Sequence, residues 1–175
     1  LRPVEGLTLR ATAFGRRTDG HMGLQMLMDR LAELGLALPS VVPPVAAYVP
    51  AVRSGALVFT SGQLPMVDGQ LTAVGKVGAL VSPEQAKELA RTCALNALAA
   101  IDALVGLDSV VRVVKVVGFV ASTPDFIGQP GVINGASELL GEIFGDAGTH
   151  ARSAVGVAVL PLDSAVEVEF VFEFA

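Results

Sequence analysis

The chain has 175 residues, of which 52% are hydrophobic and 17% charged, with a formal net charge of -5. This predicts one domain with a substantial core, and no apolar run reaches the roughly 18 to 20 residues that a membrane-spanning helix needs. The acidic balance, a single Tyr and the lack of Trp argue against a nucleic-acid partner. The one cysteine, Cys93, excludes disulfides and cysteine metal clusters, and without a visible signal peptide we expect a cytoplasmic protein.

Residues 1–23 differ from the rest of the chain, because arginines outnumber acidic residues there and no hydrophobic period emerges. We predict an atypical N-terminal extension, non-native or poorly ordered, rather than a basic arm that contacts nucleic acid. Residues 24–175 are predicted to form a single domain. Its low charge and long valine segments predict that some apolar surface is buried between copies in a homo-oligomer.

The first third of the domain is predicted to hold one helix and two extended segments. Leucines at helical spacing predict a docking helix over residues 24–34, ended by Gly35. Four prolines between residues 36 and 54 predict an extended path along the surface or a sheet edge. Residues 55–66 predict a strand that breaks at residues 61–63. Exposed N–H groups at this break could bind an anion or a carbonyl, or the break is a plain β-bulge.

The middle of the chain carries the clearest helix and strand. Ser82 is placed to cap a helix that begins at Pro83 and ends at Gly106. The buried stripe of this helix includes Cys93, which we interpret as inert core rather than as a nucleophile. A nearly unbroken valine run then predicts a central strand over residues 110–120.

The C-terminal part predicts one more helix and two alternating strands. The helix covers residues 132–144, and Asn134 near its start is interpreted as a local cap, with ligand contact as the alternative. The strands cover residues 152–159 and 166–174 and meet at a turn around residues 160–165. The whole order predicts an α+β fold: a single mixed β-sheet with two helices packed on one face, plus an N-terminal helix.

Arg152 stands on a strand face that is otherwise made of the small residues Ala154, Gly156 and Ala158. Such a face leaves room for a ligand carboxylate beside one fixed charge, or for another backbone. A purely structural Arg152, paired with a carboxylate of a neighbouring subunit, is the alternative. The nearby His150 is interpreted as a surface or capping residue rather than as a base.

Three segments carry a family resemblance: AYVPAVRSGALVFTSGQLP at 47–65, VVRVVKVVGFVAS at 110–122 and HARSAVGVAVLPLDSAVEVE at 150–169. They resemble the Rid/YjgF family of reactive-intermediate (imine) deaminases, also called endoribonuclease L-PSP-like, and the similarity covers residues 40–175. The resemblance implies a chorismate-mutase-like fold, a homotrimer, and hydrolysis of 2-imino or enamino acids to 2-oxo acids and ammonia, with no metal or organic cofactor. Ala154 departs from the family, whose deaminases usually carry cysteine there, so we expect a divergent subfamily.

The resemblance also implies roles for individual residues. Arg152 would hold the substrate carboxylate through a bidentate pair, and Glu167 would position or activate the attacking water. The positions that match the family's substrate-binding cleft are Tyr48, Ser61, Gly62, Asn134 and the backbone at Ala154. From the residues alone, Tyr48 is interpreted as a packed aromatic with a solvated hydroxyl.

The spacing of the two charged residues adds an expectation about assembly. If residues 160–165 form a simple hairpin, Glu167 lies opposite Ala158, and Arg152 is roughly 20 Å away along the strand. We therefore expect the two charges to meet only across a subunit interface. Two other functions stay open: a non-catalytic homotrimer that binds small carboxylates or 2-oxo acids with Arg152 and the backbone of residues 61–62, and a ribonuclease, which the absence of a His pair or metal site disfavours.

Overall fold

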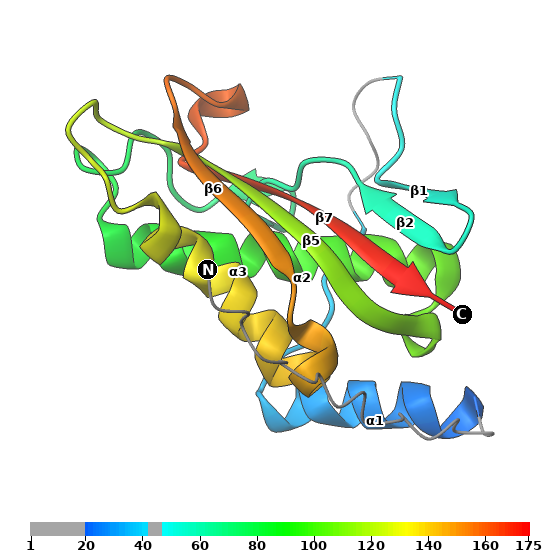
Figure 1. Cartoon of the computed structure of the whole chain (residues 1–175). Helices are drawn as coiled ribbons and strands as arrows, with labels where there is room; N and C mark the ends of the chain where they lie inside the picture. Colours follow the sequence, from blue (N-terminus) through cyan, green and yellow to red (C-terminus); the bar gives the residue numbers. More distant parts are fainter. Residues whose placement is uncertain (1–19, 42–46) are drawn as a thin grey trace, which may run out of the picture.

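The computed structural model describes residues 20–41 and 47–175, which fold around one mixed five-stranded sheet (Figure 1). The strand order is β1-β2-β7-β5-β6, in which β5 and β6 are parallel and all other neighbours are antiparallel. The strands are β1 (Ala51–Ser54), β2 (Leu57–Thr60), β5 (Val110–Ala121), β6 (Ala151–Val157) and β7 (Val166–Phe174). A separate short hairpin consists of β3 (Met66–Val67) and β4 (Gln70–Leu71).

Two long helices, α2 (Pro83–Val105) and α3 (Gln129–Phe144), cover one face of this sheet, which confirms the predicted α+β architecture (Figure 1). The predicted N-terminal helix is α1 (Gly20–Glu33), which begins four residues before the predicted start. Most of the predicted extension, residues 1–19, lies outside the described residues. Within the described residues, no helix has both the length and the apolar character needed to cross a lipid bilayer.

The core forms where β7 faces the helices. The alternate residues of β7 are buried and include Phe170 and Phe172, while the residues between them are half-buried. α2 presents a stripe of buried alanines to this face, which lets the helix approach the sheet closely. The Ser82 hydroxyl accepts a hydrogen bond from the Gln85 N–H at 3.1 Å, so the predicted cap of α2 is confirmed.

The predicted hairpin between β6 and β7 is wrong, because both strands pair with β5, on its opposite edges (Figure 1). β5, α3 and β6 form a crossover unit, which places the two parallel strands side by side. The other edge of β5 is then occupied by β7. The link between β6 and β7 contains a short 3-10 helix, Pro161–Asp163, instead of a tight turn.

This pairing places the two predicted catalytic residues on opposite faces of the sheet. Val116 of β5 aligns with both Arg152 and Phe170, and Val116 and Phe170 are buried under the helices. Glu167 aligns with Phe119, three positions further along β5, and an odd offset reverses the face. Arg152 therefore lies on the helix-covered face and Glu167 on the open face, about 10 Å apart along the strands and two strands apart across them.

Candidate functional site

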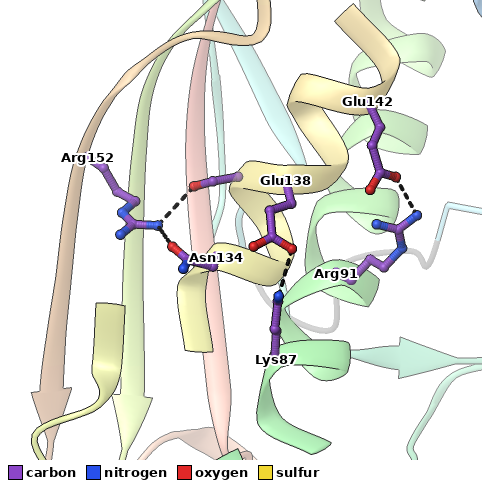
Figure 2. A network of polar contacts seen from close by, with 7 residues as sticks. Lys87, Arg91, Asn134, Glu138, Glu142 and Arg152 are labelled. Carbon is purple, nitrogen blue, oxygen red and sulfur yellow. Dashed lines mark hydrogen bonds and ion pairs between the residues drawn. The ribbon is translucent and has the colours of Figure 1, made fainter. Parts of the chain in front are cut away.

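Arg152 is held at the edge of the sheet by two side chains of α3 (Figure 2). Its Nη1 donates to Asn134 Oδ1 at 2.8 Å and to Ser137 Oγ at 3.1 Å. Residues three apart share one helix face, so both oxygens reach the same guanidinium nitrogen. The capping role expected for Asn134 is wrong: α3 begins at Gln129 with Pro130 in its first turn, which places Asn134 inside the helix.

The carboxylates of α3 are engaged elsewhere. Glu138 pairs with Lys87 at 2.7 Å and Glu142 pairs with Arg91 at 2.8 Å, and both basic partners belong to α2 (Figure 2). Among the described residues, the ion pairs do not include Arg152. The half-buried guanidinium is therefore held by neutral oxygens, and its positive charge is left uncompensated within the described part of the chain.

Ser137 was not identified from the sequence, although its distance of three residues from Asn134 is a usable signal. Its Oγ lies 2.9 Å from Nε2 of His150, and Nδ1 of His150 lies 2.6 Å from the carbonyl oxygen of Gly148. His150 is thus a half-buried member of the site rather than a surface residue. These residues line a groove of about 350 Å³ formed by Ser137, Gly141, Gly145, Gly148, Thr149, His150 and Arg152.

The small side chains next to Arg152 accommodate α3. Gly118 of β5 aligns with Ala154 of β6, and a Cβ atom at Gly118 would collide with the side chain of Ile133. Ala154 is half-buried and packs against the apolar core. The small residues here therefore leave room for a side chain of α3 to pack against the sheet.

Glu167 forms the second half of the candidate site, on the open face. A Cβ atom at Gly62 would collide with the carboxylate of Glu167, so the backbone at Gly62 and this carboxylate lie directly against each other. Partial burial raises the pKa of the Glu167 carboxyl, and the charge of Glu169 raises it further. The carboxylate is therefore more basic than an ordinary glutamate.

At the break at residues 61–63, two of the three backbone N–H groups are engaged within the chain. The Ser61 N–H donates to the Pro50 carbonyl at 2.8 Å, and the Gln63 N–H donates to the Val168 carbonyl at 2.8 Å. With Glu167 beside Gly62, an anion at this position would also be repelled. The segment continues the edge of the sheet as an isolated bridge to Val168 instead.

The remaining predicted residues occupy contrasting surroundings. The Ser61 hydroxyl donates to the Val49 carbonyl at 2.6 Å, which brings the segment containing Tyr48 close to Ser61. Tyr48 is 51% exposed, so the interpretation as a packed aromatic is wrong for the single chain.

Cys93 is fully buried, which confirms its interpretation as an inert core residue. Its burial raises the pKa of the thiol, and the charge of Glu167 raises it further. Within the described residues, no three His, Cys, Asp or Glu side chains are grouped to hold a metal ion.

Comparisons with known proteins agree with this fold. A family model described as YjgF/chorismate mutase-like, putative endoribonuclease, matches residues 28–174. Protein TCP17 of Trypanosoma cruzi is 44% identical over 145 residues, covering 82% of this chain and 91% of that protein. Atu1372 of Agrobacterium tumefaciens, described as of unknown function, has a crystal structure that aligns with a TM-score of 0.81 at 42% identity, covering 88% of this chain and 95% of that one. Escherichia coli TdcF with bound serine aligns with a TM-score of 0.55 at 28% identity, covering 78% and 93%. The chain described here belongs to the YjgF/chorismate mutase-like family.

Proposed function

We propose that the protein hydrolyses 2-imino or enamino acids to 2-oxo acids and ammonia, at clefts between its subunits. The observation that carries the proposal is the guanidinium of Arg152, which α3 holds through neutral oxygens and which pairs with no carboxylate among the described residues. A planar guanidinium that is fixed but not neutralised suits the carboxylate of a small acid. The serine bound to TdcF carries the same kind of carboxylate.

Glu167 is the proposed general base. Water adds to the carbon of the C=N bond, which an enamino acid forms by tautomerising, while Glu167 accepts a proton from that water and passes it to the nitrogen. The carbinolamine hydroxyl then gives up its proton to the amino group as the C=O bond forms, the C–N bond breaks and ammonia leaves. A glutamate with a raised pKa is better matched to proton transfer near neutral pH than an ordinary one.

The proposed cleft involves a second copy of the chain, and the position of Arg152 and Glu167 on opposite faces of one sheet supports this. The open face also carries three exposed apolar side chains, Val52, Phe59 and Val155, all aligned with the Glu167 side of the sheet. Coverage of this face by neighbouring copies would bury them and supply each Glu167 with an Arg152. We retain the homotrimer as the assembly that the family resemblance implies.

The decisive experiment measures the release of 2-oxo acid from enzymatically generated imino acids above the spontaneous rate. Arg152→Ala is expected to lose about 100-fold or more in activity, because the carboxylate loses its charged anchor. Arg91→Ala is the matched control, since it removes another arginine bound to α3, and its activity should equal that of the wild type. Oligomeric state is matched by light scattering, and full turnover by the Arg152→Ala trimer would refute the proposed role of this residue.

A second candidate function is a non-catalytic assembly that binds small carboxylates or 2-oxo acids. It is favoured by Ala154, which offers no reactive side chain where the family's deaminases carry cysteine. It differs from the first candidate in one measurable respect: calorimetry would detect pyruvate binding that Arg152→Ala abolishes, with no turnover of any imino acid. A ribonuclease stays the weakest reading, because the chain carries a net charge of -5.

A further inference from the structure

The hydrogen bonds behind Arg152 can run in only one direction when His150 is neutral. The Gly148 carbonyl can only accept, so Nδ1 of His150 must carry the ring proton and Nε2 keeps its lone pair. The Ser137 hydroxyl, 2.9 Å from Nε2, therefore donates its hydrogen to His150. The lone pairs of Ser137 Oγ are then directed to the other side, where Arg152 lies.

Because Ser137 donates to His150, its oxygen can accept a hydrogen bond from Arg152. The guanidinium of Arg152 therefore donates to α3 through Nη1. Nη1 of Arg152 has two hydrogens, and it donates to two acceptors, Ser137 Oγ and Asn134 Oδ1. For Nε and Nη2 no acceptor is found among the residues that the structure describes. Figure 2 shows these two nitrogens turned away from α3. An Nε–H and an Nη2–H point the same way, so together they form an intact fork for two carboxylate oxygens.

We propose that Ser137 and His150 are positioning residues that bind the Nη1 end of Arg152 and present its Nε–Nη2 edge to the ligand carboxylate. His150 orients the Ser137 hydroxyl, and Ser137 together with Asn134 holds the guanidinium in one plane. The ligand class, small 2-imino and 2-oxo acids, rests on the proposed function. The binding geometry and the roles of Ser137 and His150 rest on the hydrogen bonds alone.

The test separates positioning from bulk stability. Ser137→Ala removes one of the two acceptors for Nη1, and we expect the KM for an imino acid and the Kd for pyruvate to rise about tenfold, with kcat within about twofold of wild type. Ser137→Thr keeps the hydroxyl and should restore both values. Thr92→Val is the control, because it removes a hydroxyl that donates to the Glu88 carbonyl within α2, outside the groove that Arg152 lines, and it should bind pyruvate like the wild type.

A second pair of variants keeps the test valid if Ser137→Ala does not fold. His150→Phe removes the acceptor for Ser137, whereas His150→Gln retains an acceptor near the position of Nε2, so Phe should weaken pyruvate binding more than Gln does. Wild-type protein that binds pyruvate without turning over imino acids would remove the proposed function and leave this inference standing. Unchanged KM and Kd in Ser137→Ala and His150→Phe, or a wild type that binds no carboxylate, would overturn the inference.

Discussion

The two halves of the candidate site carry opposite charges in opposite kinds of surroundings. On the helix-covered face, Arg152 is fixed by the two hydrogen bonds that it donates to α3, with neutral oxygens as its only partners among the described residues. Glu167 lies on the open face against the backbone of Gly62, and both burial and Glu169 disfavour its charge. Neither charge has an oppositely charged partner in its own half of the site, among the described residues. Within one chain, the sheet separates Arg152 from Glu167.

Local hydrogen bonding and charge compensation are separate properties of these two sides of α3. On the other side of α3, Glu138 and Glu142 neutralise Lys87 and Arg91, so that the surface there is balanced. Arg152 has hydrogen bonds of 2.8 and 3.1 Å but no compensating charge in the described residues. Rigid placement without neutralisation is what a binding site for an anion requires.

The largest expected effect comes from removing the charge of the anionic half. Glu167→Gln should lower kcat about 100-fold or more, because the general base is lost.

The same variant tests stability. The raised pKa of the Glu167 carboxyl means that the folded chain disfavours its ionised form, so the wild type loses stability as the pH rises through the folded-state pKa. Glu167→Gln should therefore melt at or above the wild-type temperature at neutral pH, with a difference that vanishes in acid. A lower melting temperature at neutral pH would argue for a structural role.

Mixing the two inactive variants tests whether the halves come from different copies. When Arg152→Ala and Glu167→Gln chains are unfolded and refolded together in equal amounts, about a quarter of the interfaces should combine two intact residues. Activity should then recover to roughly that fraction of wild type, more than tenfold above either variant alone. No recovery in oligomers proven to be mixed would mean that the halves do not form one site across an interface.

Neutralising the cationic half should have an intermediate effect. Asn134→Asp places a carboxylate where Oδ1 now lies, 2.8 Å from Nη1 of Arg152. The new ion pair would compete with an anionic ligand, and we expect the Kd for pyruvate to rise roughly tenfold or more. Asn134→Ala, which removes the same hydrogen bond without adding charge, should have a smaller effect in calorimetry. Equal effects of the two variants would mean that charge compensation is unimportant here.

The smallest effects are expected on the balanced side of α3. Lys87→Ala and Arg91→Ala each break a partly exposed ion pair, which should lower the free energy of unfolding by less than about 1 kcal/mol. Urea denaturation measures this loss, and the KM for imino acids should not change. A raised KM in either variant would show that the two sides of α3 are coupled.

Local patterns in the sequence were sufficient to predict those helices and strands whose ends are set by neighbouring residues. The limits of α2 follow from the side chain of Ser82 and from Gly106, and the valine run predicted β5 almost to the residue. The alternation of β7 also predicted correctly that Glu167 lies on the side opposite the buried residues. All of these depend on contacts within a few residues.

The errors concern contacts between distant segments. Alternation does not specify which strand lies beside which, so the hairpin of β6 and β7 was a plausible but wrong pairing. A β-α-β order was already visible in the prediction and could have placed β6 next to β5. Likewise, proline is favoured in the first turn of a helix, so Pro130 could have been used to predict that α3 begins near it and that Asn134 lies inside the helix. The role of Ser137 was recognised from its hydrogen bond with Arg152, and that of His150 from its contact with Ser137.

Gly141, in the groove beside Arg152, is a position where the choice of glycine calls for a reason. It lies inside α3 at a position where an added Cβ atom would meet nothing within 4 Å, so packing within the described chain does not require a glycine. A glycine there makes the helix less stable than alanine would by about 1 kcal/mol, and alanine is a common replacement during drift. Natural selection has reason to retain this glycine only if something outside the described residues occupies the free volume. Gly141 is therefore a position at which sequence divergence among relatives would record a change of ligand or of partner surface.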